Sequence, residues 1–278
     1  MAESGDEKPF HLMLADYGYD VWIGNNRGTE YSQGHTEYDA AGESAEQYWD
    51  FTWADMSKDD KANVEMIKER TNLNKIHYIG LSQGNTQMHY ALAHDATWYK
   101  DNLHRAVQLA PCFVSQISES VLTSYDDTIA SFRENGIFAL NGPNWVETYD
   151  QICNIYGQKT CDSVADEMEG KQPVSVKSEQ HWIQNNLVDG FNEFQDEWTS
   201  GVTKSAPIDV SKIDYVPMSF FIATEDELCT YDDAYKYIAK MDKADKTVYE
   251  LVGKGHDFFN HPARDGYFMT RLLKELSK

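Results

Sequence analysis

One serine in this sequence has the surroundings that make a serine hydroxyl a nucleophile. Residues 80–84 read Gly-Leu-Ser-Gln-Gly and fit the pattern Gly-x-Ser-x-Gly. They follow an apolar stretch that ends at Ile79, and a helical pattern begins directly after them at Asn85. A strand, a tight turn and a helix in this order form a nucleophile elbow, in which the glycines leave room for a strained serine. We therefore predict that Ser82 is a nucleophile.

A covalent reaction at Ser82 needs further groups close to the hydroxyl. A base must remove its proton, and an acid must orient that base. Asp226 and His256 each come a few residues after an apolar stretch with the composition of a buried strand. Their order after the serine is the order found with this elbow. We expect Asp226 to orient His256, and the backbone N–H of Gln83 to donate to an oxyanion.

Three neighbouring residues are alternatives for these roles. Glu225 and Glu227 flank Asp226, and a glutamate can do the same work. His261 lies shortly after His256, which is favoured because a glycine precedes it directly after an expected strand. The other histidines are expected to have packing or surface roles: His11, His35, His77, His89, His94, His104 and His181.

The elements that would position these groups alternate along the chain. Apolar stretches typical of strands are separated by helical patterns, which predicts an α/β fold with a mostly parallel sheet flanked by helices. The expected strands are 19–24, 75–80, 105–110, 217–223 and 247–252. The expected helices are 59–71, 85–94, 230–241 and 265–276.

Residues 113–206 interrupt this alternation, because they are rich in aromatic side chains and helical in pattern. We predict that they form a helical cap inserted into a discontinuous α/β core of residues 1–112 and 207–278. Insertions of this kind lie over the carboxyl ends of strands, where ligands bind. The aromatic residues of the cap either line a substrate site or form its core: Trp145, Trp182, Phe191, Phe194 and Trp198.

Four cysteines bear on metal binding and on the compartment. Cys112, Cys153, Cys161 and Cys229 lack the paired spacing of a zinc site. Cys153 and Cys161 could close a short disulfide loop if the compartment is oxidising. The alternative is that all four cysteines are buried or unreactive thiols.

The charge balance excludes some partners. The 278 residues include 24 basic and 46 acidic residues, for a formal net charge of −22. Such a surface repels phosphates, so we expect no nucleic-acid partner and only transient contact with a membrane or lipid droplet. The sequence has no apolar run of the ~18 residues that span a bilayer. Its polar first residues lack the apolar region of a signal peptide.

The longest specific motif lies near the start of the sequence. Residues 14–28 read Leu-Ala-Asp-Tyr-Gly-Tyr-Asp-Val-Trp-Ile-Gly-Asn-Asn-Arg-Gly. This stretch resembles the signature of the acid lipases, the family of the gastric and lysosomal acid lipases. Four further stretches are similar to that family: 48–60, 76–86, 109–111 and 176–196.

The resemblance implies an α/β-hydrolase fold and a reaction. Ser82 would be the nucleophile, Asp226 the orienting acid and His256 the base in the hydrolysis of carboxylic esters. The implied substrates are neutral lipid esters, either acylglycerols or sterol esters. The resemblance implies neither a metal nor an organic cofactor and suggests a secreted or lysosome-like location. Protein partners are unknown from the sequence.

The sequence departs from the family at three places. Leu81 stands where the family usually has His, and the family motif His-x-Asp-Phe is one residue shorter at His256. The family also has an upstream strand ending in His-Gly-Leu, whose loop supplies a second oxyanion N–H. We find no counterpart and expect N-terminal strands of the sheet to be missing. The alternatives are therefore a catalytically impaired remnant that binds lipid or a protein partner, and an esterase or thioesterase of the same fold.

Overall fold

The computed structural model describes residues 8–116, 128–129, 131–196, 205–260, 262 and 265–278. The chain divides into two compact units. The first unit contains Met1–Gly24, Asp60–Gln116 and Ile208–Lys278, and the second contains Asn25–Asp59 and Ile117–Pro207. Residues 25–59 are thus grouped with the stretch for which we predict a cap. The assignment of residues 113–206 to that cap stays a prediction.

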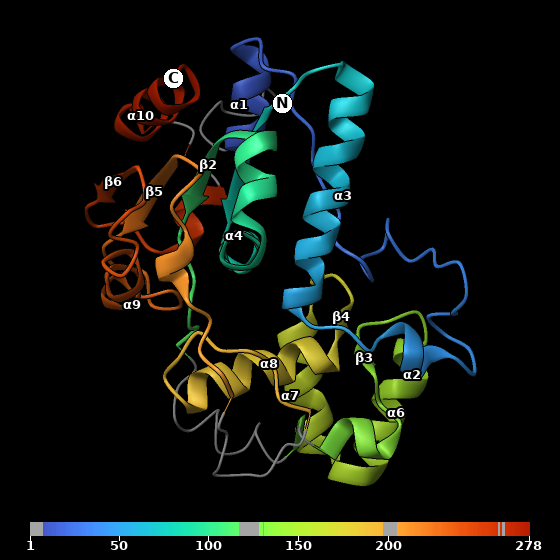
Figure 1. The fold of residues 1–278 in the computed structure, drawn as a ribbon. Coiled ribbons are helices and arrows are strands. Elements are labelled where there is room, and N and C mark those ends of the chain that lie inside the picture. Colours follow the sequence, from blue (N-terminus) through green and yellow to red (C-terminus); the bar gives the residue numbers. More distant parts are fainter. Residues whose placement is uncertain (1–7, 117–127, 130, 197–204, 261, 263–264) are drawn as a thin grey trace, which may run out of the picture. The chain divides into compact units, whose positions relative to one another are not determined.

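A parallel sheet forms the centre of the first unit (Figure 1). Within the described residues it has four strands, in the order β1-β2-β5-β6. The strands are β1 (Ile76–Leu81), β2 (Leu103–Leu109), β5 (Met218–Ala223) and β6 (Lys246–Leu251). Every residue of β5 is buried, as expected for a largely apolar strand covered on both faces. The predicted α/β fold class is confirmed.

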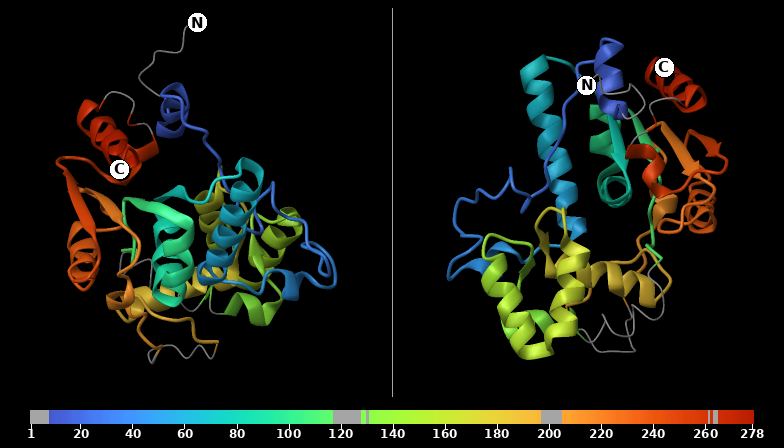
Figure 2. Two further views of the ribbon diagram at one scale, coloured as in Figure 1. Left: turned by 45° about the horizontal axis from the view of Figure 1, so that its top comes forward. Right: turned by 180° about the vertical axis from the view of Figure 1, so that it is seen from behind.

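Side chains that alternate along the strands pack against helices on the two faces of the sheet. Phe221 belongs to a core cluster with residues of α1 (Phe10–Asp16) and α10 (Gly266–Leu276). Its neighbour Phe220 points the other way and stacks on His89 of α4 (Gln83–Asn102), with the ring centroids 6.0 Å apart. Figure 2 shows α10, which carries the C-terminus, beside β5 and β6.

The described residues of the first unit form further elements. They are the second part of α3 (Trp53–Thr71), α4 (Gln83–Asn102), α9 (Tyr231–Ile238), and the 3₁₀ turns η2 (Val210–Lys212) and η3 (His256–Asn260). Helix α4 continues beyond the predicted end at residue 94, through a kink at Asp95 with φ −139° and ψ 42°. Helix α3 begins six residues before the predicted start.

The prediction of a strand at residues 19–24 is wrong. This segment has no regular secondary structure. A strand requires a hydrogen-bonded neighbour, and among the described residues β1 is paired on one side only, with β2. Trp22 and Ile23 are 40% and 68% exposed, so the segment is not a buried strand.

The described residues of the second unit are mainly helical. Its elements are α2 (Ala45–Tyr48), η1 (Arg133–Asn135), β3 (Ala139–Leu140), α6 (Trp145–Tyr156), α7 (Gln158–Met168), β4 (Val174–Ser175) and α8 (Val176–Leu187), with the start of α3. A disulfide between Cys153 and Cys161 joins α6 to α7. In the described part of the chain, no helix combines the length and apolar composition needed to cross a membrane.

Candidate active site

Ser82 stands in a strained turn between β1 and α4. Its φ of 53° and ψ of −119° lie outside the regions that side chains ordinarily adopt. The glycine two residues earlier is required by space, because a Cβ on Gly80 would lie 2.6 Å from Oδ1 and 2.9 Å from the backbone N of Asn85. A Cβ on Gly84 would make only an ordinary contact, 3.6 Å from the Tyr78 hydroxyl. The first glycine of the motif therefore allows the elbow to close.

Asn85 fixes this elbow to the end of the neighbouring strand β2. Its fully buried side chain donates hydrogen bonds to the carbonyls of Leu109 and Ala110, the latter at 3.1 Å. The backbone N–H of Ser82 also donates to the Leu109 carbonyl, at 3.1 Å. Ala110 itself has a positive φ of 47°. The backbone at the carboxyl end of β2 thus holds both Ser82 and the first turn of the helix that follows it.

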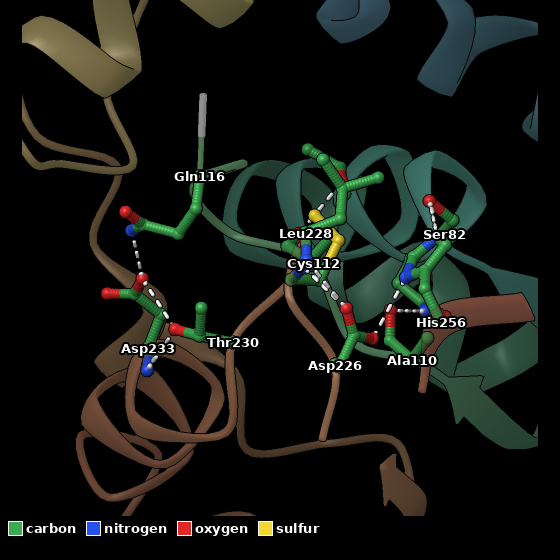
Figure 3. Close-up of a disulfide and its surroundings, with 12 residues drawn as sticks. Ser82, Ala110, Cys112, Gln116, Asp226, Leu228, Thr230, Asp233 and His256 are labelled. Atoms are coloured by element: carbon green, nitrogen blue, oxygen red, sulfur yellow. Dashed lines mark hydrogen bonds and ion pairs between the residues drawn. A yellow bond between two sulfur atoms is a disulfide. The ribbon is translucent and has the colours of Figure 1, made fainter. Parts of the chain in front are cut away.

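The predicted nucleophile, base and orienting acid lie in one hydrogen-bonded row (Figure 3). His256 Nε2 is 2.9 Å from Ser82 Oγ, and His256 Nδ1 is 2.9 Å from Asp226 Oδ2. With Nδ1–H donating to the carboxylate, Nε2 of the neutral imidazole accepts from the serine hydroxyl. The side chain of Asp226 is only 1% exposed, whereas that of His256 is 21% exposed.

The two glutamates that flank Asp226 lie differently. Glu225 and Glu227 are exposed, whereas Asp226 is buried. The second oxygen of Asp226, Oδ1, accepts from the backbone N–H groups of Leu228 and Cys229, at 3.0 Å and 2.8 Å. The geometry therefore joins Asp226 to His256. The alternative base, His261, lies outside the described residues.

Three other histidines are held neutral by burial. Desolvation lowers the pKa of His89 to about 3, and the pKa values of His77 and His181 to about 4. His89 stacks on Phe113, with the ring centroids 4.2 Å apart. These surroundings are those of packing residues.

The donor set around the site does not suit a metal ion. Ligand atoms of Asp226, Cys229 and His256 lie within 4.8 Å of one another. The Cys229 sulfur, however, is bonded to Cys112 in a disulfide, so it is not a thiolate ligand. The imidazole already uses both of its nitrogens for hydrogen bonds.

Gln83 and the aromatic residues of the predicted cap are the other predicted site residues. Gln83 is the first residue of α4, directly after the serine. Trp182 and Phe191 are 9% and 1% exposed within the second unit, and both rings pack near Trp53, at 5.6 Å and 5.5 Å between centroids. Phe194 meets the His181 ring edge-on at 5.4 Å. Trp198 lies outside the described residues, and a substrate-lining role for these aromatic residues stays a prediction.

One covalent feature of the site was not foreseen from the sequence. Cys112 follows β2 and Cys229 follows Asp226, and their disulfide joins residues 117 apart in sequence. The available signal was weak: each cysteine comes shortly after an expected strand, and parallel strands bring such positions to the same edge. The pairing of Cys153 with Cys161, which we considered, is present.

Known proteins resemble this chain in fold and in sequence. Residues 7–260 match the family model described as alpha/beta hydrolase fold, and the chain belongs to this family. The gastric triacylglycerol lipase of Bos taurus is 34% identical over 124 residues, which are 38% of this chain and 30% of that protein. Lipase 1 of Drosophila melanogaster is 34% identical over 108 residues, which are 38% of this chain and 24% of that protein. These curated relatives are lipases, which confirms the resemblance drawn from the motifs.

The chain spans only about a quarter to a third of the length of these two lipases. A solved structure, a soluble variant of monoglyceride lipase from Saccharomyces cerevisiae, covers 91% of this chain and 75% of its own. The TM-score is 0.53 at 10% sequence identity, which is a likeness of fold alone.

Proposed function

We infer that this chain hydrolyses carboxylic esters through Ser82, His256 and Asp226. The observation that carries the proposal is the row of two hydrogen bonds, each 2.9 Å long, that joins the serine hydroxyl to the imidazole and the imidazole to the carboxylate. The strained backbone at Ser82 supports the same assignment, because such strain persists mainly where function requires it. The Gly-x-Ser-x-Gly sequence and the lipase relatives point the same way.

The first half of the reaction forms an acyl-enzyme. Ser82 Oγ attacks the ester carbonyl carbon while His256 Nε2 takes the hydroxyl proton. The carbonyl oxygen becomes an oxyanion, to which the backbone N–H of Gln83 donates. When the tetrahedral intermediate collapses, the bond to the alcohol breaks and His256 gives its proton to the leaving oxygen. Asp226 keeps the imidazole in the correct tautomer and stabilises its charged form.

The second half releases the acid. Water enters, His256 Nε2 removes one of its protons, and the resulting hydroxide attacks the acyl carbon. Collapse of this second intermediate breaks the bond to Ser82 Oγ, which regains a proton from the imidazolium. The carboxylic acid leaves, and the starting state is restored without a cofactor.

Neutral lipid esters are the proposed substrates, either acylglycerols or sterol esters. The support is the acid-lipase signature at residues 14–28 and the lipase relatives. The cap predicted at residues 113–206 would supply aromatic side chains for acyl chains, and contact with a lipid surface would be transient. Two disulfides fit an oxidising, secretory or lysosome-like compartment.

Hydrolysis of p-nitrophenyl esters, from butyrate to palmitate, tests this function. The chain and its Ser82→Ala variant are compared at acidic and neutral pH. We expect hydrolysis by the chain and a loss of about 10³-fold or more in the variant, because the nucleophile is removed. A preference for long acyl chains would favour a lipase, and a preference for short ones an esterase.

Two results would contradict the proposal. Equal rates for the chain and Ser82→Ala would show that Ser82 is not the nucleophile. A cooperatively folded chain without activity on any ester would exclude hydrolysis by this chain. Binding of a lipid without turnover would then be measured next, because it is the main alternative.

A further inference from the structure

The loop that carries Asp226 is attached to the segment after β2 at two places. The Cys112–Cys229 disulfide is one attachment (Figure 3). The second is a backbone hydrogen bond of 2.7 Å from the N–H of Gln116 to the carbonyl of Leu228. Both attachments reach residues that also serve the carboxylate, since the N–H groups of Leu228 and Cys229 donate to Asp226 Oδ1.

These contacts leave the carboxylate little freedom. Oδ1 is held by the two N–H groups, so Oδ2 is the oxygen that faces His256 Nδ1. Cys112 and Cys229 are each 2% exposed, and the buried bond is therefore part of the packing around Asp226. A shift of Cys229 would move one of the two donors that set the direction of the carboxylate.

The other end of the disulfide is linked to the helix that starts after Ser82. The hydroxyl of Thr86, in the first turn of α4, donates to the backbone carbonyl of Cys112 at 2.8 Å. One path of short contacts therefore runs from the nucleophile helix through Thr86, Cys112 and Cys229 to Asp226. Parallel strands β2 and β5 bring the two cysteines to the same edge of the sheet.

We propose that the Cys112–Cys229 disulfide is a positioning device for Asp226, which it holds in register with His256 and Ser82. The proposal rests on the proposed function, in which Asp226 orients the imidazole. The cysteines act through the aspartate and do not touch the substrate. Misplacement of a catalytic group by about 1 Å costs on the order of 100-fold in rate, so a small shift of this loop would be visible in kcat.

A double-mutant cycle on p-nitrophenyl butyrate hydrolysis tests the proposal. The variants are Cys112→Ser/Cys229→Ser, Asp226→Asn and the combination of all three changes. We expect the cysteine change to lower kcat by about 10- to 100-fold, with KM within about threefold. In the Asp226→Asn background the same cysteine change should lower kcat by less than about twofold, because the group that it positions is already disabled.

The second disulfide provides the matched control. Cys153→Ser/Cys161→Ser removes a bond of the same chemistry from the second unit, and we expect kcat to stay within about twofold. A merely structural role of Cys112–Cys229 would instead give the same loss of kcat with Asp226 and with Asn at position 226. That result would overturn the proposal.

Reduction of the folded protein keeps the proposal testable if the cysteine variant does not fold. In the Cys153→Ser/Cys161→Ser variant a single disulfide remains. A trialkylphosphine with one water reduces it to two thiols and becomes the phosphine oxide, a two-electron exchange. Activity should fall in step with alkylation of Cys112 and Cys229, while the far-ultraviolet circular dichroism stays constant. Reduction without loss of activity would overturn the proposal. Loss of the fold both in the Cys112→Ser/Cys229→Ser variant and in the reduced protein would overturn it as well.

Failure of the proposed function would look different. In that case Ser82→Ala and Asp226→Asn would both retain the full rate, whatever the state of the disulfide. A large loss in those two variants with no effect of the cysteine change would leave the function intact and overturn only the positioning role.

Discussion

Each unit of the molecule contains one disulfide, and the two bonds differ in what they hold. Cys112–Cys229 joins two segments of the first unit that are 117 residues apart, next to Asp226. Cys153–Cys161 joins two consecutive helices of the second unit across eight residues. The chemistry of the bond is the same, so its consequences depend on the length of chain that it closes and on the groups beside it.

Each unit also contains a buried histidine, and the two histidines differ in their hydrogen bonds. His89 in the first unit is fully buried, and both of its ring nitrogens lack a hydrogen-bond partner within the described residues. His181 in the second unit stacks on Trp53 at 4.0 Å, and its Nε2 lies 2.8 Å from the carbonyl of Asn192. Both must stay neutral, but only His181 also contributes a hydrogen bond.

The largest expected difference between the units is in the stability that their disulfides contribute. Loop-closure entropy gives about 5 kcal/mol for the 117-residue separation of Cys112–Cys229 and about 2.5 kcal/mol for the eight residues of Cys153–Cys161. Each pair is changed to serine, and the free energy of unfolding is measured in urea at neutral pH. Loss of the Cys112–Cys229 bond should lower the free energy of unfolding by about twice as much as loss of the Cys153–Cys161 bond.

Equal losses for the two pairs would contradict this explanation. They would mean that local packing around each sulfur, rather than the closed loop, sets the contribution. The slope of free energy against urea serves as the control, since a changed slope would indicate that the variant altered the compactness of the unfolded chain.

The next effect concerns stability in acid. The pKa of His89 is about 3 in the fold and about 6.5 in an unfolded chain. Between these values the unfolded state binds a proton that the folded state does not, so stability falls as the pH falls from about 6.5 to about 3. His89→Phe keeps an aromatic ring against Phe113 and removes this proton uptake. We expect its acid-unfolding midpoint to move down by about 0.5–1 pH unit, followed by circular dichroism.

His181→Phe is the matched variant in the second unit. It also removes a histidine whose pKa is lowered, to about 4, but it takes away the partner of the Asn192 carbonyl. We expect His181→Phe to lower the free energy of unfolding by about 1 kcal/mol at pH 7. His89→Phe should leave the free energy of unfolding nearly unchanged at that pH. A lower stability of His89→Phe at pH 7, with an unchanged midpoint in acid, would show that His89 has a polar partner in solution.

The elements of the first unit were predictable from sequence where local composition decides the structure. Strand β5 is apolar at every position but Ser219, and the elbow is marked by a glycine that no other residue can replace without a close contact at Asn85. Residues 19–24 have strand composition too, yet no strand forms there, because pairing depends on a neighbour that composition does not reveal.

The residues of the candidate site were predictable from the sequence, but the contacts that hold them in place were not. The order of Ser82, Asp226 and His256, each after an expected strand, was visible in the sequence. The pairing of Cys112 with Cys229 was less visible, because four cysteines allow three connectivities and a separation of 117 residues carries no local signal of their contact. Contacts of this kind depend on which strand ends become neighbours, and that is a property of the whole sheet.

The last difference separates the two glycines of the serine motif. A Cβ at position 80 meets Asn85 at 2.6 Å and backbone at 2.9 Å, so Gly80→Ala must displace the elbow. We expect a loss of about 1–3 kcal/mol in the free energy of unfolding and a lower kcat. Gly84→Ala meets only an ordinary contact at 3.6 Å and lies in helix α4, so alanine should be neutral or stabilising by up to about 1 kcal/mol. Equal stability of the two variants would mean that Asn85 yields to the added methyl group. The buried bonds from Asn85 to Leu109 and Ala110 would then not be what fixes Ser82 in its strained conformation.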